Sequence, residues 1–231
     1  AHDLGHTPFG HAGAESLNIC MKNYGGFDHN IQTLRIITLL ENRYYKFKGL
    51  NLSFETIDGL IKHNGPVKNL TKLNRILGKN FFKKKIKFSL NSSLEAQLAS
   101  ISDDIAYNSH DLEDGLNSNL FKLKDLKKIP VLDKIIIKHI KKTKKYSKDL
   151  ITRQIIREII NEMVSDVILT THKNIRKYKI KNLNDIYNTK FQLVTFSNKM
   201  KIFDIKIKKF LRQKMYFHKK VNSKTNYGRK V

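Results

Sequence analysis

Cysteine is nearly absent from this sequence, and long apolar runs are absent altogether. A lone cysteine, Cys20, excludes an internal disulfide framework and suits a reducing compartment, so we expect a cytoplasmic protein. Because its neighbours Ile19 and Met21 are apolar, we expect Cys20 to be a small buried side chain rather than a nucleophile. No uninterrupted apolar stretch approaches the roughly 20 residues that a membrane-spanning helix needs, so we expect no membrane partner.

Proline is also scarce, with three residues in a chain of 231, and strand patterns are few. Apolar positions instead recur at helical spacing through most of the chain, which predicts an all-α protein with one sizeable core. A lysine-rich connection, which could be an exposed loop with a short helical turn, is expected over 67–91, and a charge-rich tail over 219–231. The predicted helices cover residues 9–24, 29–45, 53–63, 93–110, 112–123, 130–142, 149–177 and 198–217.

Acidic residues are outnumbered, with 20 acids against 45 bases and a formal net charge of +25. One interpretation is a surface that attracts polyanions such as nucleic acid or nucleotide phosphates. The other is a general enrichment in Lys, Asn and Ile, as AT-rich genomes produce. The lysines do not alternate with aromatic residues in a repeated pattern, so the charge does not indicate a dedicated nucleic-acid domain.

The richest local pattern lies at the start of the chain, where residues 2–11 read His-Asp-Leu-Gly-His-Thr-Pro-Phe-Gly-His. Imidazole and carboxylate groups are ordinary ligands of divalent metals. The glycines allow close backbone approach, and Thr7-Pro8 interrupts a helix. A histidine-rich loop with a capping aspartate is the structural alternative, but three histidines and an aspartate in ten residues favour a metal or catalytic site.

A second pattern lies on a predicted helix far along the chain. Asp103, Tyr107 and Asp111 are spaced four residues apart, which places them on one polar stripe of a helix. Such a stripe could hold a metal at one end and bind a ligand further along. A solvated acidic face is the alternative, although acids are otherwise scarce in this chain.

Together these segments resemble the deoxyguanosine triphosphate triphosphohydrolase (dGTPase) family of HD-domain phosphohydrolases. The resemblance spans most of residues 1–120, in the family's order. It implies an all-α HD-domain helical bundle over 1–125, without its first helices, and a helical C-terminal extension over 126–231. The segments that carry it are residues 2–11, Gly25-Gly26-Phe27-Asp28-His29-Asn30, Gly49-Leu50-Asn51-Leu52, Lys62-His63-Asn64-Gly65, Ser93-Leu94-Glu95-Ala96-Gln97, Asp103-Asp104-Ile105-Ala106-Tyr107 and, faintly, Met215-Tyr216 with His218.

The resemblance implies one divalent metal ion, with Mg²⁺, Mn²⁺ and other transition metals all compatible. By position, His2 and Asp3 match the HD pair and Asp103 matches the distant aspartate. The family's first histidine would precede Ala1. A motif that starts at residue 2 therefore leads us to expect a chain that begins inside a domain.

The family removes the whole triphosphate from deoxynucleoside triphosphates. By resemblance, His11 is the catalytic histidine and His6 its phosphate-side or acid–base partner, while His29 and Asn30 face the substrate. The family's acid three residues after His11 is replaced by Ala14 here, and Glu15 is an imperfect substitute because it is rotated by about 100° along a helix.

Tyr107 and Asp111 match positions that contact the sugar, where a tyrosine ring can exclude a 2′-hydroxyl. We expect a deoxynucleoside triphosphate substrate, with dGTP favoured, a homo-oligomer, and single-stranded DNA as a further candidate partner. Another HD phosphohydrolase activity and a degenerate HD domain that binds nucleotide or nucleic acid without turnover remain as alternatives.

Overall fold

The computed structural model describes residues 2–78, 86–140 and 145–230, and it confirms the all-α class. Within those residues the only β-type pairing is an isolated bridge between Tyr44 and Phe47. No helix in the described part of the chain combines the length and the apolar character needed to cross a membrane.

The chain divides into two compact units that interleave along the sequence. The first comprises Ala1–Leu98, Ile180–Gln192 and Ser223–Val231, and the second comprises Ala99–Lys179 and Leu193–Asn222. The two units are defined by contacts within the fold, whereas the boundary predicted at residue 125 is based on the family resemblance of the sequence. That boundary stays a prediction.

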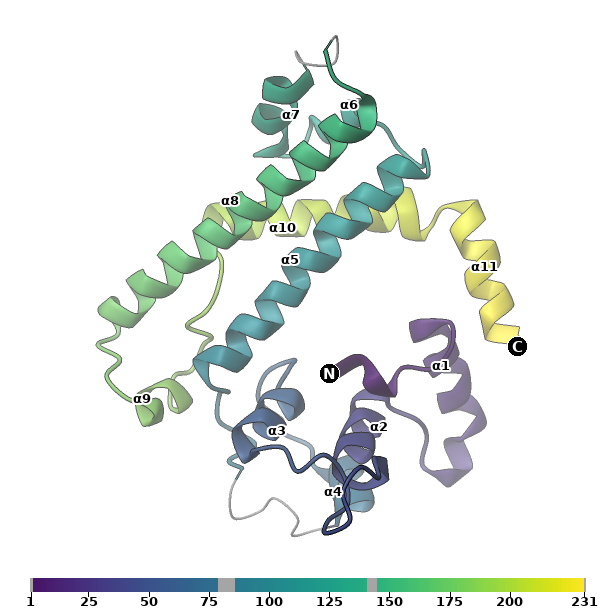
Figure 1. The fold of residues 1–231 in the computed structure, drawn as a ribbon, viewed down its shortest axis with the longest axis vertical. Helices are drawn as coiled ribbons and strands as arrows, with labels where there is room; N and C mark the ends of the chain where they lie inside the picture. The colour runs from purple at the N-terminus through teal and green to yellow at the C-terminus, as the bar shows by residue number, and fades with distance from the viewer. Residues whose placement is uncertain (1, 79–85, 141–144, 231) are drawn as a thin grey trace. The chain divides into compact units, whose positions relative to one another are not determined.

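The first unit is built from short helices around a small apolar core. The core side chains are Leu34, Ile37, Ile57, Leu73 and Ile86. A 3₁₀ turn, η1, packs on α2, and α2 packs on α3 and α4 (Figure 1). The elements are η1 (His2–Gly5), α1 (Gly10–Cys20), η2 (Lys22–Tyr24), α2 (His29–Arg35), the π-helical turn η3 (Ile36–Leu40), α3 (Phe54–Ile61), α4 (Thr71–Leu77), the start of α5, α9 (Leu183–Tyr187) and most of α11 (Lys219–Lys230).

Longer helices form the second unit, and α7 packs against α8 there (Figure 1). Its elements are the rest of α5 (Leu94–Asn117), α6 (Leu123–Leu126), α7 (Leu132–Ile140), α8 (Lys148–Lys177), α10 (Asn198–Leu211) and the π-helical turn η4 (Arg212–Tyr216). Ser147 and Ser197 cap α8 and α10 through their hydroxyl groups. The apolar residues that recur every four positions along α8 are buried from Ile151 to Val167, whereas Leu169 is exposed.

Several predicted boundaries were wrong. The helix predicted over 29–45 ends at Leu40, because a π-helical turn closes it and extended backbone follows at Glu41. The break predicted between 110 and 112 does not exist. Leu112 is fully buried, so packing carries α5 through to Asn117. The charge-rich tail, for which no helix was predicted, is helical over Lys219–Lys230.

Further comparisons concern turns and exposure. The connection over 67–91 contains the short helix α4, in agreement with the short helical turn expected there. Residues 79–85 of it lie outside the described residues, as does the predicted helix end at 142. Val131 has a positive φ of 75°, so α7 begins at Leu132 rather than at Pro130. Cys20 is exposed, not buried, since it closes α1 on the solvent side of the helix.

Candidate active site: a histidine cluster beside the HD pair

The HD pair, defined here as His2 and Asp3, lies on η1, and η1 is tied closely to α2. The Gly5 amide donates to Thr33 Oγ1 at 2.9 Å, and the Thr33 hydroxyl donates to the His2 carbonyl at 2.6 Å. A Cβ atom on Gly5 would lie 2.1 Å from the His29 carbonyl oxygen. Only glycine therefore allows η1 and α2 to approach this closely.

A tight turn then leads from η1 into α1. Phe9 has a φ of 66° and Gly10 a φ of 54°, and the Thr7 hydroxyl donates to the Gly10 carbonyl at 3.2 Å. A Cβ atom on Gly13 would lie 2.0 Å from the Pro8 carbonyl oxygen, so glycine is required there too. This turn places His11 in the first turn of α1.

The third histidine is fixed by a helix cap. Asp28 is the N-cap of α2, and its carboxylate accepts from the amides of Asn30 and Ile31 at 3.1 and 3.3 Å. His29 is the first residue of the helix, so its side chain leaves a fixed point of the backbone.

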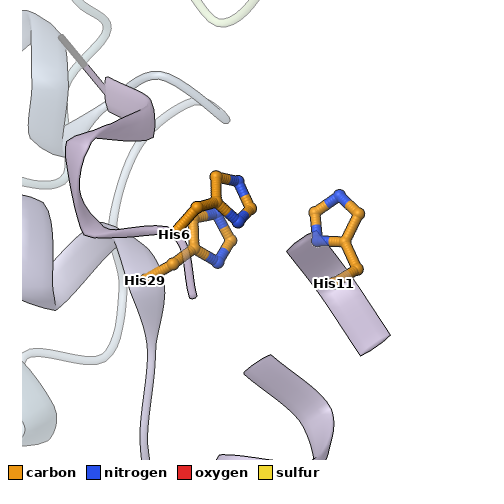
Figure 2. A group of neighbouring side chains, drawn as sticks. All are labelled: His6, His11 and His29. Carbon is orange, nitrogen blue, oxygen red and sulfur yellow. The ribbon is translucent and has the colours of Figure 1, made fainter. Parts of the chain in front are cut away.

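These elements bring together the histidine cluster, which we define as His6, His11 and His29 (Figure 2). The rings of His6 and His29 are stacked, with centroids 4.1 Å apart. The His11 ring lies at a steep angle to both, 5.1 Å from His6 and 5.7 Å from His29. One ring nitrogen of each histidine lies within 4.8 Å of the others.

Burial and neighbouring charge shape the cluster. Burial is the main cause of a lowered pKa at His29, and the adjacent His6 ring and then the His11 ring lower that pKa further, while Asp28 and Asp3 oppose the shift. Burial and the neighbouring imidazoles therefore favour the neutral form of His29. His6 Nδ1 is buried and has no hydrogen-bond partner in the described part of the chain, while His6 Nε2 lies 3.3 Å from Asp3 Oδ1.

The HD pair has the donor atoms that a divalent metal needs. His2 Nε2 lies 3.2 Å from Asp3 Oδ2, so the two adjacent side chains lean toward one point, as their place on a 3₁₀ turn allows. His63 stacks on the His2 ring with centroids 4.1 Å apart. The sequence assigned no role to His63, although it falls within a quoted motif. Asp103 is exposed on α5 in the second unit, and its role as the distant ligand stays a prediction.

In the second unit, Tyr107 and Asp111 share a partner that the sequence did not identify. The phenol of Tyr216, from η4, donates to Asp111 Oδ2, and Tyr107 also hydrogen-bonds to Tyr216. Burial raises the pKa of Asp111, and burial together with these bonds raises the pKa of Tyr216. The faint likeness at Met215-Tyr216 was the only sequence signal for this contact.

Asp104, which lies next to the polar stripe on α5, has a structural role. Asp104 and Asp204 both pair with Lys208, at 3.0 and 3.1 Å, and the Asn108 amide donates to Asp204 at 2.7 Å. These bonds join α5 to α10 within the second unit. Asp104 is therefore explained by packing rather than by ligand binding.

Two predicted site residues have local partners of their own. The Glu15 carboxylate, 62% exposed, lies 3.0 Å from Arg229 on α11. Asn30 lines a cavity of about 330 Å³ together with Asp28, Lys72 and apolar side chains of α2 to α4. The catalytic role of Glu15 and the substrate contact of Asn30 stay predictions.

Several known proteins that are similar to this chain share one name. No family model matches the chain. The chain is 51% identical over 231 residues to the deoxyguanosinetriphosphate triphosphohydrolase-like protein of Pelagibacter ubique. The aligned region covers all of this chain and 62% of that relative. Proteins of the same name are 43% identical in Bartonella tribocorum and 41% in Rickettsia typhi, over 97% and 94% of the chain. The chain spans 57% and 56% of those two relatives, so it matches little more than half of their length.

Proposed function

This chain is a relative of the deoxyguanosinetriphosphate triphosphohydrolase-like proteins, and from that premise we propose that the protein hydrolyses deoxynucleoside triphosphates, with dGTP favoured, to deoxynucleoside and inorganic triphosphate. The activity is proposed for the whole protein, because the chain spans 62% or less of these relatives. The observation that supports it best is the placement of three imidazoles next to the HD pair.

Imidazoles suit each step of this reaction. Water attacks the α-phosphorus in line, the bond from phosphorus to the 5′ oxygen breaks, and a proton must reach that oxygen. His29 would donate a ring N–H group to a phosphate oxygen. His6, whose Nε2 faces Asp3, would donate from Nδ1 in its imidazolium form. His11, exposed at the start of α1, would give its proton to the leaving 5′ oxygen, because an imidazole titrates near neutral pH.

A metal held by His2, Asp3 and Asp103 would neutralise charge on the triphosphate when bound. The donor set is consistent with this, since the HD pair offers an imidazole nitrogen and a carboxylate oxygen at one point. Asp3 would at the same time orient His6 through its second oxygen.

Selection of the sugar would fall to the second unit. The Tyr107 ring, 56% exposed, would lie against C2′ and exclude a ribonucleotide, and Asp111 would accept a hydrogen bond from the 3′-hydroxyl. Tyr216 holds Asp111 in place for that role.

The test is the product. The protein, supplied with Mn²⁺ or Mg²⁺ and a dNTP, should release inorganic triphosphate, and His11→Ala should lower kcat by about 10²- to 10⁴-fold. His172→Ala, which changes an exposed histidine of α8, is the matched control and should leave turnover unchanged. Asp103→Ala should lose both metal content and turnover. Release of phosphate or pyrophosphate would assign another HD phosphohydrolase activity instead.

One observation favours a second candidate, a degenerate domain that binds nucleotide or nucleic acid without turnover. Ala14 stands where the family has the acid that orients His11, and the net charge is +25. Absence of any product, with tight binding of single-stranded DNA, would select this candidate. A homo-oligomer is proposed for either function, and sedimentation of the protein would test it.

A further inference from the structure

We propose that the histidine cluster is itself a binding site for a transition metal of the Zn²⁺ class, separate from the metal predicted at the HD pair. The first support is spatial. Three side chains from η1, α1 and α2 each place a ring nitrogen within 4.8 Å of the other two (Figure 2). Three protein ligands and one open position are the usual number for an accessible zinc site.

The second support is the hydrogen bonding of His6. Its Nε2 faces the Asp3 carboxylate, which accepts only, so the proton of neutral His6 belongs on Nε2. Nδ1 then carries a lone pair, and Nδ1 is the buried atom without a partner in the described part of the chain. A carboxylate behind one ring nitrogen and a metal on the other is the common arrangement for metal-bound histidine.

The fit requires a small closure of the cluster. Zn–N bonds of about 2.0–2.1 Å place tetrahedral ligand atoms about 3.3 Å apart, against the 4.8 Å limit of the present spread. Rotation of the stacked His6 and His29 rings about their side-chain bonds can supply this change. The solvent exposure of His11 leaves an approach for the ion and for a water in the fourth position.

The two sites would select different metals. The histidine cluster offers three nitrogens, which favour Zn²⁺, Cu²⁺, Ni²⁺ and Co²⁺. The predicted HD site includes two carboxylates, Asp3 and Asp103, which also suit Mg²⁺ and Mn²⁺. An ion in the cluster would occupy the lone pair of His11, so it would inhibit the hydrolysis. This last consequence rests on the proposed function, whereas the binding does not.

The test uses Co²⁺ as a spectroscopic substitute for Zn²⁺, added to the full chain at neutral pH. We expect the intense visible bands of a tetrahedral site, removed by one equivalent of Zn²⁺. The bands should persist in His2→Ala, which removes the imidazole of the HD pair, and in His172→Ala. They should disappear in His11→Ala and in His29→Ala, with metal affinity lower by at least about tenfold.

His11 is exposed, so His11→Ala is expected to fold, and circular dichroism of each variant would verify this. Absence of tetrahedral bands in the wild-type chain overturns the proposal, as do bands that follow His2→Ala rather than His11→Ala. The activity assay is a separate arm. Zn²⁺ inhibition of Mn²⁺-supported triphosphate release would establish the regulatory consequence. Zn²⁺ binding without any hydrolase activity would refute the proposed function and leave the metal site standing.

Discussion

The two groups of candidate site residues are built in opposite ways. The histidine cluster is held by short elements, tight turns and glycines that permit backbone contact. Tyr107, Asp111 and Tyr216 instead project from a long regular helix and a π-helical turn. Short elements can bring three segments to one point, but their positions depend on single backbone contacts. A long helix positions Tyr107 and Asp111 by their spacing along it, and Tyr216 contacts them from a π-helical turn.

The Gly5→Ala substitution tests whether backbone contact between η1 and α2 positions the histidine cluster. The added Cβ would meet the His29 carbonyl and the Thr33 amide, both backbone groups that cannot move aside cheaply. We expect a loss of about 3 kcal/mol in the free energy of unfolding, because overpacking of this kind forces backbone shifts. Urea unfolding would measure it.

Gly10→Ala is the matched control, since its φ is positive but no atom lies within 4 Å of the added Cβ. It should cost only about 1 kcal/mol. Equal costs for the two variants would show that backbone contact is not what fixes η1 on α2.

Tyr216→Phe tests the helical group. It removes the hydroxyl that donates to Asp111, and we expect a loss of about 1–2 kcal/mol. Asp111→Asn should cost a similar amount, and the double variant should cost less than the sum, as thermal unfolding of the four proteins would show. Additive losses would mean that the two side chains do not act together.

A smaller change in stability is expected from the ion pairs of Glu158 with His139 and Lys138, which lie outside both groups. His139 Nε2 lies 2.6 Å from Glu158, and Lys138 lies 2.7 Å from it, which joins α7 to α8. The Lys138 bond, followed by that of His139, lowers the pKa of Glu158. A carboxylate whose pKa is lower in the folded than in the unfolded protein stabilises the fold at a pH above its unfolded-state pKa. That stabilisation is lost as the pH falls through the folded-state pKa.

Glu158→Gln should therefore cost about 1 kcal/mol at pH 7. The difference should shrink as the pH falls below the ordinary glutamate pKa of about 4.3, and it should vanish once the pH is below the lowered pKa of Glu158 in the folded protein. Denaturant unfolding at a series of pH values would measure this. A difference that persists at the lowest pH would assign the effect to packing and not to charge.

The smallest effect is expected for Arg229→Ala. Its partner Glu15 is 62% exposed, and exposed pairs contribute roughly 0–1 kcal/mol. The backbone carbonyl of Arg229, which accepts from Ser16, is kept in this variant. A cost well above 1 kcal/mol in thermal unfolding would show that α11 stabilises the start of α1 through this side chain.

Helical spacing gave the most reliable predictions. It located α8 with its buried stripe from Ile151 to Val167, and it placed Tyr107 and Asp111 on one face of α5. It failed at Leu40, where a π-helical turn ends the helix that was predicted to reach residue 45, and at Lys219, where α11 begins in a segment without a predicted helix. Cys20 was predicted buried because its neighbours are apolar, but whether a side chain is buried depends on what packs above it.

The sequence by itself determined the all-α class, the family resemblance and the presence of two further histidines, His6 and His11, near the HD pair. Helical periodicity and local motifs can be recognised within short stretches of chain. Only the tertiary structure decided which groups meet. It brought His29 onto His6, His63 onto His2 and Tyr216 onto Asp111. These contacts join residues 23 to 105 positions apart, and such contacts depend on how glycines, caps and buried side chains let separate elements approach.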